Sequence, residues 1–187
     1  MAVSNTKKIG QTMTKDTHTA NNEPVFIKIL QTEDVSENYV NWYSNKQVIR
    51  YSDNQYRSFS LEGQKNYVRS CLDNNDVDLY GIFFKSKHIG NIVISGLTSV
   101  HKRAEITYVI GDTNFWGKGY GSYAVAEIIN KAKNHYKLYK LFAGLAEGNK
   151  GSEAVLRKNG FLLEGRRKNH LFYSEKWCDQ LDFGLII

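Results

Sequence analysis

Short runs of hydrophobic residues alternate along this chain with longer segments in which hydrophobic residues recur at helical spacing. The short runs are rich in Val, Ile, Leu, Phe and Tyr and are bounded by polar turns, which is typical of strands. They lie at residues 25–30, 78–84, 88–97, 104–110, 138–146, 161–167, 171–177 and 181–187. The three runs between residues 78 and 110 follow one another closely and predict an antiparallel meander.

Four helices are expected between these strands. Thr32 is a good N-cap for a helix that ends near Asn45, and Ser60 is a good N-cap for a second helix. The second helix is expected to turn one face inward, with Tyr67, Val68, Cys71 and Leu72. The third helix aligns Val125, Ile128, Ile129, Ala132 and Tyr136 at spacings of 3, 4, 7 and 11. A short fourth helix begins at about residue 150 and ends at Gly160, which suits a left-handed cap.

The order of these elements predicts an α+β domain. The strand that ends at Ile110 and the strand that begins at Leu138 are joined by a helical crossover, so these two strands should be parallel. Residues 23–187 are expected to form a single domain. Residues 1–22 are polar and lack large apolar groups, so they predict a flexible tail.

Size and composition agree with one folded domain. The chain has 187 residues, of which 41% are hydrophobic and 24% charged, enough for a core of its own. No apolar run approaches the roughly 18 residues that span a bilayer, and the N-terminus lacks the apolar segment of a secretory signal. We therefore expect a cytoplasmic protein without a membrane partner. Cys71 and Cys178 are expected to be free thiols, with Cys71 in the core.

Positive charge is concentrated in one part of the chain. Residues 117–176 carry 12 Lys/Arg and 5 Asp/Glu, a net charge of +7, whereas the remaining residues sum to −1. This distribution suits a ligand with several phosphates, and nucleic acid is the rival interpretation. Many of the lysines lie on the polar face of the third helix, where charges are usually solvated, so we expect no nucleic acid partner. The scattered histidines show no metal-ligand spacing, and we expect no metal.

A glycine-rich turn joins the strand 104–110 to the third helix, with the sequence Asn-Phe-Trp-Gly-Lys-Gly-Tyr-Gly-Ser over residues 114–122. Glycine lets the backbone approach a ligand closely, and the first amides of the helix lack partners, so the turn predicts an anion site suited to phosphate. The pattern lacks the Gly-Lys-Ser/Thr of a Walker loop. It also lacks the spacing and the later acidic residue of a dinucleotide fingerprint. A loop without a ligand is the alternative.

This turn resembles the pyrophosphate-binding loop of the GNAT superfamily of acyl-CoA N-acyltransferases. Trp116 stands where that family has Gln or Arg, and the form Trp-Gly-x-Gly is similar to the RimJ/RimL-like branch. Other motifs follow in the family's order: Arg50-Tyr51, Ile89-Gly90-Asn91-Ile92, Ala104-Glu105-Ile106, Asn149-x-x-Ser152, Lys158-Asn159-Gly160-Phe161 and Glu164-Gly165. The resemblance runs from about residue 25 to the C-terminus.

The resemblance implies the GNAT fold, a mixed sheet of about seven strands flanked by about four helices. It also implies that acetyl-CoA binds in a splay between the two central parallel strands. The implied cofactor-binding residues are the main chain of Tyr108, Val109 and Ile110, the loop Trp116, Gly117, Lys118, Gly119, Tyr120, Gly121 and Ser122, and Asn149 with Ser152. For Lys118, a solvent-exposed loop lysine is the alternative to phosphate contact, and Ser122 is expected to cap the helix.

Glu105 is the candidate general base, because it is the one carboxylate within an otherwise apolar strand. Alternation with a period of two places it on one face with Thr107 and Val109. A carboxylate that faces a partly dry groove has a raised pKa, which suits a base. Electrostatic attraction of the substrate amine and a solvent-facing Glu at a strand start remain open, and His101 and Asp78 are weaker candidates.

The general acid is less clear from the sequence. Many GNAT enzymes use a Tyr four residues before the Gly-Phe glycine, and this chain has Leu156 there. The Asn-x-x-Ser pattern of RimL-like sequences implies that Asn149 bonds pantetheine and that Ser152 approaches the sulfur. Asn149 as a simple helix cap is the alternative. A CoA thiolate is also a fair leaving group without an acid.

The acceptor is expected to be a small-molecule amine, and the motif spacing is most similar to members that acetylate amino-sugar nucleotides. Arg50, Tyr51 and His101 are the candidate substrate residues. Two alternatives stay open: acetylation of a protein N-terminus, and a module that binds CoA without catalysis. The protein is expected to be a monomer or a homodimer.

Overall fold

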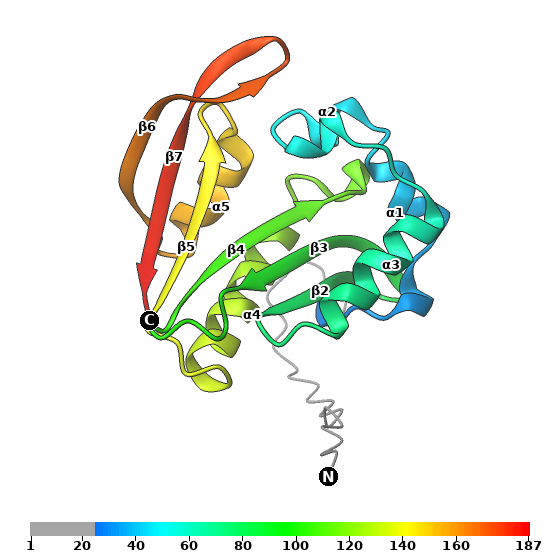
Figure 1. Cartoon of the computed structure of the whole chain (residues 1–187), viewed down its shortest axis with the longest axis horizontal. Coiled ribbons are helices and arrows are strands. Elements are labelled where there is room, and N and C mark those ends of the chain that lie inside the picture. The colour runs from blue at the N-terminus through cyan, green and yellow to red at the C-terminus, as the bar shows by residue number, and fades with distance from the viewer. Residues whose placement is uncertain (1–24) are drawn as a thin grey trace.

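The computed structural model describes residues 25–187, and they form one seven-stranded sheet in the order β1-β2-β3-β4-β5-β7-β6 (Figure 1). The strands are β1 Val25–Ile29, β2 Val77–Phe84, β3 Lys87–Ser95, β4 Arg103–Ile110, β5 Lys140–Ala146, β6 Leu162–Tyr173 and β7 Lys176–Ile186. β4 and β5 are parallel and all other neighbours are antiparallel, which confirms the predicted crossover and the α+β class. The tail expected at residues 1–22 lies outside the described residues.

Helices cover both faces of this sheet. The α-helices are α1 Glu37–Trp42, α2 Lys46–Ile49, α3 Leu61–Leu72, α4 Tyr120–Asn134 and α5 Lys150–Lys158. Short 3-10 turns are η1 Thr32–Asp34, η2 Asp53–Tyr56 and η3 Thr113–Phe115. Two predicted caps are confirmed: the Ser60 hydroxyl accepts from the Gly63 N–H at 3.1 Å, and Gly160 has a φ of 85° after α5.

The single helix predicted between Thr32 and Asn45 is wrong. Thr32 begins only η1, and the chain is extended at Val35 before α1 starts. The Ser36 hydroxyl caps α1 by accepting from the Tyr39 N–H, and the Asn45 side chain caps α2, which was not predicted. Good N-cap residues compete with helix continuation, so a new helix begins after Ser36 and another after Asn45.

The C-terminal hairpin was also predicted with the wrong boundaries. Residues 161–167 and 171–177 were expected as two strands, but residues 162–173 form the single strand β6, and residues 176 and 177 already belong to β7. The hairpin turns at Ser174 and Glu175, which have φ values of 51° and 62°. Such turns need positive φ at both central positions and usually carry Gly or Asn. Ser174 and Glu175 are neither, so the turn could not be recognised from the sequence. The register of β6 shifts between Arg167 and Leu171.

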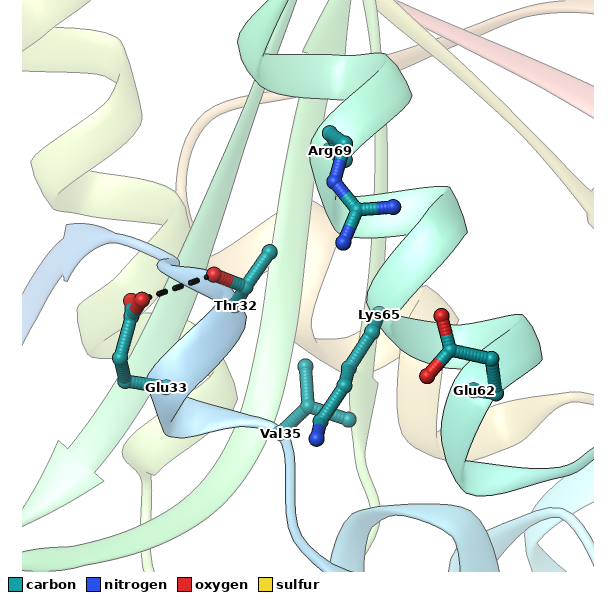
Figure 2. Close-up of a pocket in the computed structure, with 6 residues that line it drawn as sticks. All are labelled: Thr32, Glu33, Val35, Glu62, Lys65 and Arg69. Atoms are coloured by element: carbon teal, nitrogen blue, oxygen red, sulfur yellow. Dashed lines mark hydrogen bonds between the residues drawn. The ribbon is translucent and has the colours of Figure 1, made fainter.

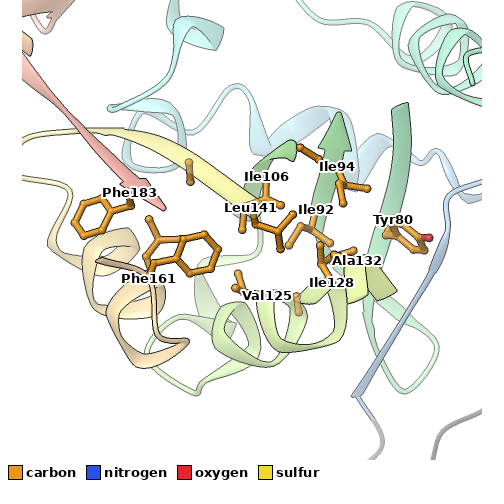
Figure 3. Packing of buried hydrophobic residues seen from close by; sticks show 14 of the residues in the cluster. Tyr80, Ile92, Ile94, Ile106, Val125, Ile128, Ala132, Leu141, Phe161 and Phe183 are labelled. Atoms are coloured by element: carbon orange, nitrogen blue, oxygen red, sulfur yellow. The ribbon is translucent and has the colours of Figure 1, made fainter. Parts of the chain in front are cut away.

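Two hydrophobic cores hold the helices against the sheet. The larger core packs α4 and α5 on one face, and Figure 3 shows Val125, Ile128 and Ala132 of α4 against Ile92, Ile106 and Leu141 of the strands. The smaller core packs α1 and α3 on the other face and includes Cys71, as predicted. Tyr67 was expected to face inward but is 43% exposed.

The alternation predicted for β4 is confirmed. Ala104 and Ile106 are buried in the core on the α4 side. Glu105 and Thr107 point to the opposite face and are exposed, because α1 and α3 cover the sheet at β2 and β3. The middle of β4 therefore has one covered face and one accessible face.

Candidate active site

The parallel strands β4 and β5 separate along their length. They are paired only where Arg103, Ala104 and Glu105 face Lys140, Leu141 and Phe142. Beyond this point β5 stays paired with β7 as far as Ala146, whereas residues 106–110 of β4 have a strand neighbour only on the β3 side. The result is a V-shaped opening with a free main-chain edge along Tyr108 and Val109, as the family resemblance implied (Figure 1).

The glycine turn stands at the wide end of this opening and starts α4. Gly117 and Gly119 have φ values of 72° and 87°, which side-chain-bearing residues adopt at a cost. A Cβ at either position would meet nothing within 4 Å, so the space in front of the loop is open. Among residues 25–187, no group accepts a hydrogen bond from the backbone N–H groups of residues 117–122. These amides and the helix dipole fit a pyrophosphate.

Side chains fix this loop to the end of β4. The Trp116 indole N–H donates to the Ile110 carbonyl at 2.7 Å, which gives the tryptophan in place of Gln/Arg a structural role. The buried Asp112 carboxylate accepts from the Asn114 N–H at 3.0 Å and pairs with Lys87 at 2.7 Å. Asp112 and Lys87 were not predicted from the sequence, although Asp-x-Asn before a turn is a common capping pattern.

The remaining loop residues divide between solvent and core. Lys118 is exposed, with its Nζ 5.7 Å from the centroid of the Phe115 ring. Tyr120 is buried in the larger core, so of this residue only the main chain faces the opening. Ser122 was expected to cap α4, but the structure contradicts this: Gly119 is the N-cap, and the buried Ser122 hydroxyl accepts from the Asn159 side chain at 3.0 Å.

The β5–α5 corner forms the opposite side of the opening. Asn149 caps α5, since its side-chain oxygen accepts from the Ser152 N–H at 3.3 Å. Two tyrosine hydroxyls from other elements donate to carbonyls of this corner: Tyr51 to Gly148 and Tyr108 to Ser152, both at 3.0 Å. Leu156, at the family's acid position, is 1% exposed and belongs to the core.

Glu105 lies at the closed end of the opening, where β4 and β5 part. No hydrogen bond or ion pair of its carboxylate is present within the described part of the chain. Loss of water beside the strands raises the pKa of Glu105, and the nearby Asp182 carboxylate raises it further. Asp182 is itself paired with Arg167 at 2.7 Å, which partly offsets its negative charge.

The three candidate substrate residues are not brought together. Arg50 is exposed at the end of α2, with its guanidinium 4.8 Å from the centroid of the Tyr51 ring, and Tyr51 anchors both to the β5–α5 corner. His101 lies in an exposed turn before β4, beyond the closed end of the opening, where Arg103 still pairs with Lys140. The alternative base Asp78 lies near the start of β2, where it accepts a hydrogen bond from Tyr136.

The β6–β7 hairpin reaches across to η2, a contact that sequence reasoning missed. The Tyr173 hydroxyl donates to Asp53 at 2.9 Å, and the Tyr56 hydroxyl donates to the Phe172 carbonyl. Figure 1 shows this hairpin rising beside α2 on the side of the opening. The hairpin tip and η2 therefore meet beyond the end of β5, on the side of the wide end of the opening.

A pocket of 340 Å³ lies elsewhere, between η1 and α3 (Figure 2). Its lining combines two acids and two bases around Val35, and the Thr32 hydroxyl donates to Glu33 at 3.0 Å. None of the candidate cofactor, catalytic or substrate residues lines it. Within residues 25–187, no cluster of three or more potential metal ligands is found, and no helix is long and apolar enough to cross a membrane.

The sequence and the fold were both compared with known proteins. The sequence profile of the acetyltransferase (GNAT) domain matches residues 25–162. A Bacillus subtilis protein, YdaF, whose name provisionally assigns it as a ribosomal N-acetyltransferase, is 30% identical over 121 residues, which are 65% of each protein. The alignment thus spans just under two thirds of that relative.

Solved structures share the fold. The ribosomal L7/L12 α-N-protein acetyltransferase RimL, in complex with coenzyme A, has a TM-score of 0.79 at 20% identity and covers 91% of this chain and 96% of its own. A spermidine N-acetyltransferase from Vibrio cholerae, with CoA and spermine, has a TM-score of 0.77 at 16% identity over 87% and 95% of the two chains. The chain belongs to the acetyltransferase (GNAT) family and is similar to its RimJ/RimL-like members.

Proposed function

We propose that this acetyltransferase moves an acetyl group from acetyl-CoA to the primary amine of a small molecule, by direct attack while both substrates are bound. The observation that carries the proposal is the position of Glu105. Its carboxylate has no hydrogen bond or ion pair within residues 25–187, and it lies at the closed end of the β4–β5 opening, on the face that the helices leave accessible. An amine that enters from this face meets the base and the free edge of β4 together.

Bound acetyl-CoA supplies a thioester that is activated toward amines. The amides of residues 117–122 bind its pyrophosphate, and the exposed edge of Tyr108 and Val109 binds pantetheine as an added strand. Glu105 accepts the proton that the amine must lose, and its raised pKa brings it closer to neutral pH. Asn149 holds the first turn of α5 in place beside the opening.

For the acceptor, we propose an amino-sugar nucleotide. Its phosphates need cations beside the opening, and Arg50 is a candidate because it is exposed, has no ion-pair partner within residues 25–187 and is fixed against Tyr51. A planar guanidinium binds phosphate well. His101 is left without a role in this proposal because it lies beyond the closed end of the opening.

A basic peptide N-terminus or a polyamine is the second candidate. Glu105 and Asp182 lie close enough to raise the pKa of Glu105, and an acidic site attracts a cationic amine. This pair supports a positively charged acceptor, whereas Arg50 supports one that carries phosphate.

The test is acetyl-CoA turnover, measured as release of free thiol, against amino-sugar nucleotides, polyamines, aminoglycosides and peptides that start with Ala or Ser. Calorimetric titration with CoA runs beside it. Turnover with amino-sugar nucleotides alone supports the first candidate, and turnover with peptides or polyamines supports the second. Tight CoA binding without turnover on any acceptor would argue against catalysis and for a CoA-binding module.

A further inference from the structure

The phenol of Tyr108 crosses the opening between β4 and β5. Tyr108 lies in the part of β4 that has left β5, and its side chain points to the α4 and α5 side with those of Ala104, Ile106 and Ile110. It is the only polar side chain of β4 on that face. Its hydroxyl donates to the Ser152 carbonyl, in the first turn of α5, at 3.0 Å.

The same turn of α5 carries one other hydroxyl, that of the Ser152 side chain, which lies beside the Tyr108 phenol. Leu156, where a family acid would stand, is buried in the core one turn further along the helix. The Ser152 N–H is engaged by Asn149 and the Ser152 carbonyl by Tyr108. Tyr108 thus presents a phenol O–H at the beginning of α5 from β4, the opposite side of the opening.

We propose that the Tyr108 hydroxyl is the hydrogen-bond donor to the CoA sulfur as the carbon–sulfur bond breaks. The inference rests on the proposed function and extends it to the leaving group. The electron pair of the broken bond goes to sulfur, which then takes a proton from solvent. Glu105 returns the amine proton to solvent, so the transfer is balanced.

The environment of the phenol suits a donor that keeps its proton. Burial raises the pKa of Tyr108 above that of a free phenol, and the Ser152 side chain lowers it by a smaller amount. Hydrogen bonds to a charged partner are roughly twice as strong as neutral ones. Tyr108 therefore stays with the Ser152 carbonyl in the ground state and turns to sulfur when negative charge develops there.

The test compares Tyr108→Phe with Tyr51→Phe in the full chain. Each variant loses one tyrosine hydroxyl that donates to a carbonyl of the β5–α5 corner at 3.0 Å, so they are matched for the loss of a structural hydrogen bond. The decisive measurement is the pKa of the thiol of bound CoA, followed by thiolate absorbance in the ultraviolet at saturating protein.

We expect Tyr108→Phe to raise the pKa of the bound thiol by about one unit, a tenfold loss of thiolate stabilisation. The kcat should fall about tenfold or more, with the KM for acetyl-CoA changed much less. Tyr51→Phe should leave the bound thiol pKa at the wild-type value.

Three results would overturn the inference. The first is an unchanged pKa of the bound thiol in Tyr108→Phe, while the wild type binds CoA and turns over. The proposed function would then stand, and the role of Tyr108 would be limited to its structural hydrogen bond with Ser152. Equal pKa changes in both variants would show a general effect of loosening the corner. A wild-type protein that binds no CoA would instead refute the proposed function, and the inference with it.

Discussion

Replacing Glu105 with Gln separates catalysis from stability at this site. The change keeps the shape of the side chain and removes its charge. The carboxylate has no hydrogen bond or ion pair to lose within residues 25–187, so the free energy of unfolding should change by less than about 0.5 kcal/mol. Removing a general base lowers kcat by roughly 10²–10⁴-fold, which corresponds to about 3–5 kcal/mol of transition-state stabilisation.

The pH dependence follows from the direction of the shift. The pKa of Glu105 is raised in the folded state, so folding favours its neutral form. That contribution to stability is present at low pH and is lost as pH rises through the folded pKa. Gln is neutral at all pH values, so the variant should be no less stable than the wild type near pH 7. Wild-type activity should rise with pH through the same pKa.

The assay is thiol release between pH 5 and 9, with thermal unfolding and CoA calorimetry on the same samples. Glu62→Gln serves as the control, because it makes the same charge change on α3. We expect CoA affinity and the melting temperature to stay near wild type for Glu105→Gln while turnover collapses. A kcat within threefold of wild type would refute the assignment of Glu105 as the base.

Three further changes test the surroundings of this base and the glycine turn. Asp182→Asn removes one cause of the raised Glu105 pKa, so the acidic limb of the pH–rate profile should move to lower pH, and an unmoved limb would contradict the coupling. Gly119→Ala places a Cβ in open space at a φ of 87°, so it should cost about 1 kcal/mol of stability in thermal unfolding. CoA affinity in the same variant should fall at least tenfold by calorimetry, because the Cβ enters the phosphate space, and retained affinity would argue against pyrophosphate at this loop. Trp116→Phe removes the indole donor to Ile110 and should weaken CoA binding with kcat at saturation nearly kept; a drop in kcat alone would place Trp116 nearer the chemistry.

Local sequence patterns explain which elements were predicted well. The alternation of β4, the glycine turn and the caps at Ser60 and Gly160 depend on residues close together in the chain, and the structure has them as expected. The failures arose where two local signals competed. Ser36 divided the first predicted helix, and Ser174 with Glu175 formed a hairpin turn without the residues that usually mark one.

The candidate site was predictable only in part. The sequence supplied the loop at residues 117–122 and singled out Glu105, since an isolated carboxylate in an apolar strand is a local feature. It also offered His101, as a weaker candidate base and as a substrate residue, and only the pairing of Arg103 with Lys140 separates His101 from the opening. Asp112 was overlooked because its importance depends on Lys87, from another strand.

By itself, the sequence determined most of the order of the strands and helices, the parallel crossover, the position of the glycine turn and the face on which Glu105 lies. Periodicity and turn chemistry act over a few residues, so these features can be seen along the chain. Only the tertiary structure decided where β4 leaves β5 and how the opening is closed. The contacts of Tyr108 with Ser152, Tyr51 with Gly148 and Tyr173 with Asp53 join residues 44, 97 and 120 positions apart. Such contacts depend on how whole elements pack, and no local pattern encodes them.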